Sequence, residues 1–134
     1  MAIAFAIEPD LTAAEFRAVL VASTLGQRRP VDDPVRLEKM LREADIIVTC
    51  RLDSRLIGVS RAITDFSYCC YLSDLAVDVG HQRQGIGRRL IEETHSAAGV
   101  QTRLLLLAAP AAKQYYGHVG LRHAANCWEI PRES

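Results

Sequence analysis

The chain has 134 residues, of which 49% are hydrophobic and 24% are charged, a composition typical of a folded globular protein rather than of a disordered or fibrous chain. Sixteen Lys and Arg residues balance sixteen Asp and Glu residues, so the net charge disfavours binding to nucleic acid or to an anionic membrane surface. We therefore expect a single domain over residues 1–134, with neither nucleic acid nor membrane as a partner.

Cysteine spacing and hydropathy disfavour disulfide-rich, metal-binding, secreted and membrane-spanning proteins. The four cysteines lack CxxC spacing, and adjacent Cys69 and Cys70 would point to opposite faces of a strand. We therefore expect neither a disulfide scaffold nor a metal site. The N-terminus lacks the basic start of a signal peptide, and no run approaches the roughly 18 apolar residues of a membrane span. The sequence thus favours a cytoplasmic protein.

The first third of the chain predicts a strand followed by two helices. Residues 2–7 are expected to form a short strand. Thr12 and Glu15 form a capping-box pair at the start of a helix. Asp33 followed by Pro34 predicts the start of a second helix.

The middle of the chain favours strands. Residues 46–52 and 56–63 are rich in strand-forming residues and predict a hairpin, and residues 68–79 predict a third strand. The chain then turns at Gly85 and continues with apolar residues at helical spacing until Gly99.

The last third predicts a strand, a helix and a strand. Residues 104–107 are a short, wholly apolar run, typical of a strand covered on both faces. Pro110 suits the start of a helix that continues to about Val119, and residues 121–130 return as a last strand. The whole order predicts an α+β fold with a mixed, mainly antiparallel central sheet flanked by helices on both faces.

The turn before the helix that ends at Gly99 is the first candidate site. Backbone N–H groups of residues 83–88 would gather at a helix N-terminus, which is an arrangement that binds phosphate. Gly85 and Gly87 would permit close approach and a positive φ. The turn lacks the motifs of a Walker loop and of a dinucleotide fingerprint. Taken alone, the glycine pair is equally consistent with ordinary turn chemistry.

Two segments resemble the GNAT superfamily of acyl-CoA-dependent N-acetyltransferases. Leu75-Ala76-Val77-Asp78 followed by Gln82-x-x-Gly85-x-Gly87 is similar to the family's cofactor-binding segment. Residues 115–121, Tyr-Tyr-Gly-His-Val-Gly-Leu, resemble its second motif. The resemblance implies acetyl-CoA as cosubstrate and the following cofactor-binding residues: Leu75, Ala76, Val77, Val79, Gln82, Arg83, Gln84, Gly85, Ile86, Gly87, Arg88 and Tyr116.

The resemblance also implies roles for these residues. The backbone of residues 76–79 would pair with the pantetheine arm, and residues 82–88 would hold the pyrophosphate. Tyr116 matches the position of the family's general acid, which protonates the CoA thiolate as it leaves, and Tyr115 is the alternative. A thiol of pKa about 8.5 is a tolerable leaving group, so this proton transfer would be useful rather than indispensable.

The general base is left open by the sequence. An alkyl ammonium group of pKa about 10.4 must lose a proton before it can attack. Family members often use a carboxylate or histidine on the strand before the loop, but the matching register falls near Tyr71. Asp74 on the same strand is the candidate catalytic base, and a structural hydrogen-bond acceptor is the other interpretation of this residue.

Acceptor recognition is expected to involve the first two helices, the connection from Gln27 to Asp33, the hairpin and the region from Asp65 to Cys70. The resemblance implies a primary amine, of a small molecule in the first place, and leaves a homodimer open. Asp32, Asp33 and Asp65 could attract a cationic amine, although helix capping explains Asp33 equally well.

Two departures from the expected pattern remain. Arg28 and Arg29 fit a solvated face better than an anion site. Ala109-Pro110 stands where relatives often carry an Asn that contacts the pantetheine, and the favoured interpretation is that Pro110 simply starts a helix. Because no carboxylate occupies the expected base position, a non-catalytic acyl-CoA-binding sensor is the alternative function.

Overall fold

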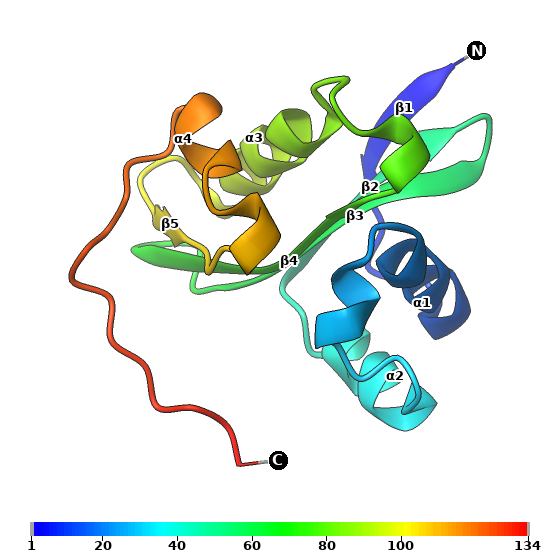
Figure 1. Ribbon diagram of the computed structural model, residues 1–134, viewed down its shortest axis with the longest axis horizontal. Coiled ribbons are helices and arrows are strands. Elements are labelled where there is room, and N and C mark those ends of the chain that lie inside the picture. Colours follow the sequence, from blue (N-terminus) through cyan, green and yellow to red (C-terminus); the bar gives the residue numbers. More distant parts are fainter. Residues whose placement is uncertain (1, 134) are drawn as a thin grey trace.

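The computed structural model describes residues 2–133, which form one five-stranded sheet whose strands follow chain order (Figure 1). Strands β1 to β4 pair antiparallel with their neighbours, whereas β5 pairs parallel with β4. The mixed, mainly antiparallel sheet that the sequence predicts is therefore confirmed. The strands are β1 (Ile3–Ile7), β2 (Ile46–Leu52), β3 (Arg55–Thr64), β4 (Cys69–Val77) and β5 (Arg103–Leu105).

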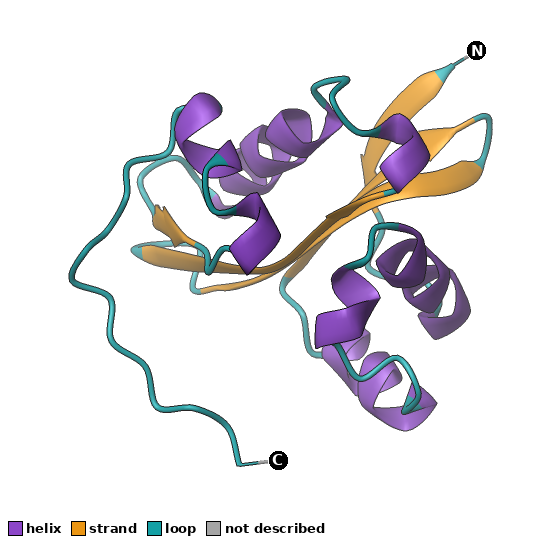
Figure 2. Ribbon diagram, in the orientation of Figure 1, coloured by secondary structure: helices purple, strands orange, loops and turns teal. Residues whose placement is uncertain are grey.

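Helices cover both faces of the sheet, also as predicted (Figure 2). The core residues of α1 and α2 pack on one face, and those of α3 pack on the other. The helical elements are α1 (Ala13–Ala22), η1 (Leu25–Arg28), α2 (Pro34–Arg42), η2 (Val79–His81), α3 (Ile86–Ala98), η3 (Pro110–Ala112) and α4 (Tyr115–His118), where η marks a 3₁₀ helix.

The helix starts follow from their capping residues. The hydroxyl of Thr12 accepts a hydrogen bond from the backbone N–H of Glu15 in α1. The carboxylate of Asp33 accepts one from the backbone N–H of Arg36 in α2. Each cap satisfies an amide that has no partner inside its own helix. Both predicted helix starts are confirmed, and α3 ends at Gly99 as predicted.

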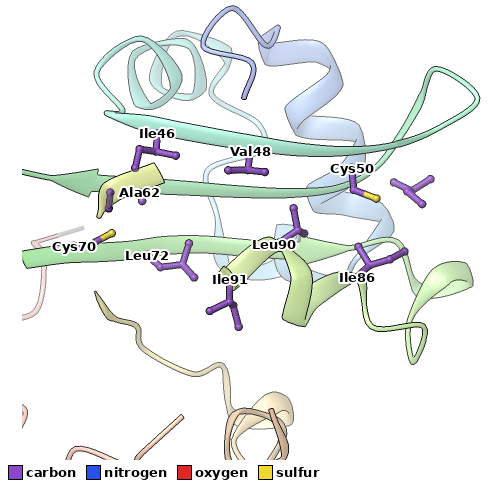
Figure 3. Packing of buried hydrophobic residues seen from close by; sticks show 11 residues of the cluster. Ile46, Val48, Cys50, Ala62, Cys70, Leu72, Ile86, Leu90 and Ile91 are labelled. Carbon is purple, nitrogen blue, oxygen red and sulfur yellow. The ribbon is translucent and has the colours of Figure 1, made fainter. Parts of the chain in front are cut away.

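Alternate side chains of β2 face two separate apolar layers. Ile46, Val48 and Cys50 belong to the cluster under α3 (Figure 3), whereas Ile47 belongs to the cluster under α1 and α2. A strand that is buried on both faces needs a mainly apolar run. The buried stretch of β2 from Ile46 to Cys50 is apolar except for Thr49, whose hydroxyl donates to the carboxylate of Glu8. Full burial of one such aliphatic side chain stabilises a fold by about 1.5–3 kcal/mol.

A bulge in β4 lies next to the point where β5 stops pairing. The β3–β4 register shifts between Arg61 and Ala62 and leaves Ser73 of β4 without a partner residue on β3. A bulge bends its strand and increases the local twist. Strand β5 pairs with β4 only from Cys69 to Tyr71, before the bulge. Beyond Tyr71 this edge of β4 has no strand partner within residues 2–133.

Two strands are shorter than predicted. The third meander strand ends at Val77 rather than at residue 79, because the carboxylate of Asp78 accepts a hydrogen bond from the N–H of Gly80 and starts η2. Strand β5 ends at Leu105. The apolar run at residues 104–107 therefore extends two residues beyond the part that pairs with β4.

The C-terminal part departs from the prediction. The expected helix from Pro110 to about Val119 is broken into η3 and α4, in a stretch where Gly117 and Gly120 weaken helix formation. Residues 121–130, which the sequence predicts as a strand, form no strand and extend away from the sheet (Figure 1). The mostly polar residues 122–126 offer no apolar face with which to pair.

The remaining expectations concern cysteines, metals and membranes. All four cysteines are free, with Cys50 and Cys70 buried and Cys69 and Cys127 exposed. Within residues 2–133, no group of three or more His, Cys, Asp or Glu side chains is arranged to hold a metal ion. None of the helices formed by these residues has the length and apolar character that a membrane crossing requires.

The exposure of Trp128 gives a direct test of the C-terminal segment. Trp128 is the single tryptophan of the chain, and it is 93% exposed. We predict that its fluorescence emission maximum is that of a water-exposed indole and does not shift when urea unfolds the protein. Far-ultraviolet circular dichroism, as the control, reports loss of the fold. A native maximum at shorter wavelength would mean that residues 121–130 pack against the protein.

Candidate active site

A cavity of about 420 Å³ lies beside the unpaired edge of β4, within the size range of small-molecule sites. Its walls come from the end of α1, from η1 and from β4, and on the other side from the segment after β5 and from α4. The residues that line it are Ser23, Thr24, Leu25, Gln27, Arg28, Arg29, Leu72, Ser73, Leu75, Ala76, Val77, Gln82, Leu106, Leu107, Ala109, Pro110, Ala112 and Tyr116.

Five of the predicted cofactor-binding residues line this cavity. Leu75, Ala76 and Val77 lie on β4 beyond its pairing with β5, and Gln82 and Tyr116 complete the group. Backbone groups on an unpaired strand edge can hydrogen-bond an extended ligand in the way that another strand would. The amide Nε2 of Gln82 donates to the carbonyl oxygen of Val77 at 3.0 Å, which closes the far end of this edge.

The other predicted cofactor-binding residues form the turn into α3. Val79 lies in η2 and is exposed, whereas the side chain of Ile86 is buried in the core. Ile86 can therefore offer a ligand only its backbone. Gly85 has a φ of 80°, a left-handed conformation that glycine adopts without steric cost. A Cβ atom placed on Gly85 would meet no atom within 4 Å, so the space beside it is open.

The backbone N–H groups of this turn are largely unpaired. No side chain caps the start of α3. The N–H groups of residues 83–87 donate to no acceptor within residues 2–133, and that of Arg88 faces the hydroxyl of Tyr115. Unpaired amides at a helix N-terminus, together with the helix dipole, favour an anion. These amides are free to bind a ligand, and their role in holding phosphate stays a prediction.

The adjacent tyrosines of α4 point to different parts of the site. The hydroxyl oxygen of Tyr115 would lie 2.5 Å from a Cβ atom on Gly87, so this residue packs against the turn into α3. Tyr116 lines the cavity. The two rings meet edge to face with centroids 5.2 Å apart. Of the two tyrosines, Tyr116 is the one that lines the cavity.

Burial keeps Tyr116 in its proton-donating form. Removal from water raises the pKa of the Tyr116 hydroxyl above its ordinary value of 10.0, and the neighbouring Tyr115 raises it further. The positive charge of Arg29 acts in the opposite direction and does not outweigh burial. A phenol with a raised pKa is protonated at neutral pH, which is the state that a general acid requires.

Asp74 is enclosed by two arginines. Its side chain is 0% exposed, and its two carboxylate oxygens accept hydrogen bonds from the Nε atoms of Arg29 and Arg61. The Nη2 atoms of the same arginines donate to Ser73, one to its carbonyl oxygen at 2.8 Å and the other to its hydroxyl at 3.0 Å. Neither oxygen of Asp74 faces the cavity as a free proton acceptor, which argues against the predicted role as catalytic base.

Arg28 and Arg29 both line the cavity, which the sequence interpretation missed. Arg28 is exposed, whereas the side chain of Arg29 is only 23% exposed. A carboxylate inside a buried strand needs a cationic partner. Asp74 therefore indicated that a basic residue from elsewhere in the chain would pack against β4. The sequence could not indicate which arginine would supply the charge.

The acidic residues considered for acceptor attraction lie outside the cavity lining. Asp33 caps α2, and Asp32 lies 3.8 Å from Arg17 on the surface. Asp65 accepts hydrogen bonds from backbone N–H groups of Tyr68 and of residues 67 and 69, which lower its pKa to about 2. These carboxylates have structural partners, and none is placed to bind an amine in the cavity.

The fold and the sequence identify the family. A mixed sheet that parts beside β4, followed by a glycine turn with unpaired amides, defines the class of acyl-CoA N-acyltransferase folds. A sequence model for the acetyltransferase (GNAT) domain matches residues 43–122, more than half of the chain. The chain belongs to the GNAT acetyltransferase family. A comparison with curated protein sequences gives no significant match.

Solved structures share this fold over nearly the whole chain. A GNAT-family acetyltransferase from Streptococcus pneumoniae TIGR4 is similar with a TM-score of 0.78 and 20% identity, covering 98% of this chain and 100% of that one. An aminoglycoside acetyltransferase from an uncultured soil metagenomic sample is similar with a TM-score of 0.71 and 20% identity, covering 99% of this chain and 95% of that one. A ribosomal-protein-alanine N-acetyltransferase from Brucella melitensis biovar Abortus 2308 is similar with a TM-score of 0.71 and 18% identity, covering 98% of this chain and 100% of that one.

Loss of the Asp74 carboxylate should destabilise the protein. We predict that Asp74→Asn lowers the free energy of unfolding by about 3 kcal/mol, because it leaves two partly buried guanidinium groups without their common counter-charge. Urea denaturation with an unchanged m-value is the measurement. Asp32→Asn removes a carboxylate whose side chain is 95% exposed, and should change stability by less than about 1 kcal/mol. Equal effects of the two substitutions would contradict the structural role of Asp74.

Proposed function

We propose that the chain is an acetyl-CoA-dependent N-acetyltransferase that moves an acetyl group to a primary amine, in the first place of a small molecule. One domain over residues 1–134 would carry the activity. The observation that supports this proposal most is the cavity beside β4, because it brings an unpartnered strand edge and the partly buried Tyr116 to one place. Membership of the GNAT family supports an acyl-CoA cosubstrate.

The residues present fit this cosubstrate. The unpaired amides of residues 83–87 would hold the pyrophosphate with that of Arg88 beside them, and the side chains of Arg83 and Arg88 would add positive charge. The free edge of β4 would hydrogen-bond the pantetheine arm and hold the thioester beside Tyr116. The proposed cofactor-binding residues are therefore Leu75, Ala76, Val77, Val79, Gln82, Arg83, Gln84, Gly85, Ile86, Gly87, Arg88 and Tyr116.

The proposed reaction is direct transfer. The amine nitrogen forms a bond to the thioester carbonyl carbon, and the bond from that carbon to sulfur breaks. Tyr116 donates its hydroxyl proton to the departing sulfur, which therefore leaves as a neutral thiol. Water carries the proton lost by the attacking nitrogen back to the Tyr116 oxygen. The chain thus supplies orientation and one proton, while the thioester supplies the driving force.

The attacking amine must first be neutral. The titratable side chains that line the cavity within residues 2–133 are Arg28, Arg29 and Tyr116, and none of them is a base at neutral pH. Solvent water would therefore remove the first proton. The same shortage of a base favours the second candidate function, a non-catalytic acyl-CoA-binding sensor. Release of CoA that depends on an added amine distinguishes the enzyme from the sensor.

A side chain at Gly85 should block the pyrophosphate site. We predict that Gly85→Val weakens acetyl-CoA binding at least about tenfold in calorimetry, because the branched side chain would occupy the open space in front of the amides. Gly99→Val is the matched control, since Gly99 also has a positive φ, of 103°, but lies at the opposite end of α3. It also strains the backbone, and its side chain must displace that of Gln101, so a loss of affinity through strain alone would appear in this variant too. Normal affinity in Gly85→Val would refute this placement of the pyrophosphate.

Removal of the Tyr116 hydroxyl should slow turnover without weakening cofactor binding. We predict that Tyr116→Phe lowers kcat by about 10- to 100-fold, at the modest end for a general acid because a thiolate leaves readily. Tyr71→Phe removes a hydroxyl outside the cavity lining and serves as the control. Because burial raises the pKa of Tyr116, the unaltered enzyme should lose no activity between pH 7 and pH 9 through its ionisation. An unchanged kcat would exclude Tyr116 as the acid.

A further inference from the structure

The side of the cavity formed by η1 and the connection to α2, where we expect the acceptor amine to bind, carries an excess of positive charge. Arg28 and Arg29 line it, and no acidic side chain of residues 2–133 does. Asp74 lies behind the cavity wall and is shared between Arg29 and Arg61. One carboxylate therefore offsets only one of these two buried guanidinium charges. The exposed Arg28 adds a further positive charge at the cavity lining.

Arg29 is held rigidly and still has donors to offer. A guanidinium group has five N–H bonds. Nε of Arg29 donates to Asp74, Nη1 donates to the carbonyl oxygen of Arg28 at 2.8 Å, and Nη2 donates to the carbonyl oxygen of Ser73 at 2.8 Å. Each Nη atom keeps one N–H bond beyond those contacts. A group fixed by three acceptors loses little conformational freedom when it binds a ligand.

The charge of Arg29 reaches the reaction centre. It lowers the pKa of Tyr116, although burial outweighs it, and both residues line the same cavity. A group bound to Arg29 would therefore lie near the proposed acid. Positive charge there also favours the neutral form of a nearby amine over its ammonium form. This arrangement assists the deprotonation for which the cavity lining offers no carboxylate.

We propose that the preferred acceptor is an amine that also carries a carboxylate, and that the carboxylate is bound by Arg28 and by the remaining N–H groups of Arg29. This inference rests on the acetyl transfer proposed above and specifies its substrate class. The planar fork of a guanidinium group matches the two oxygens of a carboxylate. An acceptor with several ammonium groups would instead meet like charge, which disfavours binding.

Three acceptors with the same four-carbon chain test the inference on the unaltered protein. They are 4-aminobutanoate, butylamine and 1,4-diaminobutane, which place a carboxylate, a methyl group or a second ammonium at the end opposite the reacting amine. We expect kcat/KM to be at least about tenfold higher for 4-aminobutanoate than for butylamine, the value of one hydrogen bond between charged groups. The diamine should be the poorest acceptor. L-alanine and L-alaninamide form a second pair with a shorter spacing.

The outcomes separate this inference from the function on which it rests. Turnover of butylamine or the diamine with no gain from a carboxylate in either set would overturn the inference and leave acetyl transfer standing. Binding of acetyl-CoA without CoA release for any amine in the panel would overturn the proposed enzyme, and the acceptor class with it.

A substitution at Arg28 tests the residue assignment. Arg28→Gln should raise KM for 4-aminobutanoate about tenfold while changing kcat little, and should affect butylamine by a smaller factor. Arg36→Gln removes an exposed arginine of α2 outside the cavity lining and should change neither. An equal loss for both acceptors in Arg28→Gln would assign this arginine to acetyl-CoA binding or to folding and would contradict the proposal.

Discussion

The carboxylate of Asp74, shared between Arg29 and Arg61, is the interaction on which the site depends. It joins β3 and β4 to the connection that follows α1, and those stretches are far apart in sequence. A buried carboxylate without a counter-charge is strongly unfavourable. Arg29 holds the connection on β4, and its contact with the carbonyl oxygen of Ser73 fixes it at the bulge. One wall of the cavity is thus set by electrostatics as well as by the apolar packing of Leu25.

The other wall follows from strand geometry. Pairing between β4 and β5 stops at Tyr71, just before the bulge at Ser73, so β4 keeps an edge without a strand partner where a ligand can bind. The chain returns after β5 to place Tyr116 at the same cavity. The apolar layers under the helices hold the sheet in place, and the site occupies the one stretch where β4 is left without a neighbour. The helices thus pack on the two faces of β4, whereas the cavity lies along its unpaired edge.

Features that depend on neighbouring residues, such as helix starts and the glycine turn, could be predicted from the sequence. Thr12 and Asp33 mark helix starts by the hydrogen bonds that their side chains accept, and a positive φ at Gly85 follows from the turn that the glycine motif requires. Long-range partners were not predictable. The pairing of Arg29 with Asp74 spans 45 positions, and only the fold brings the two together. Residues 121–130 failed as a strand because suitable residue types form one only where a partner strand is available.

Members of the GNAT family share the fold, but the choice of acceptor depends on side chains that the fold does not determine. At about 20% identity to the solved structures, the residues lining the acceptor side are free to differ. Strand β5 has a further consequence for that side. All three of its residues pair with β4, and the cavity lining that follows it comes from loop and short helical segments. The shape of that wall therefore depends on side-chain packing and not on a continuous strand ladder.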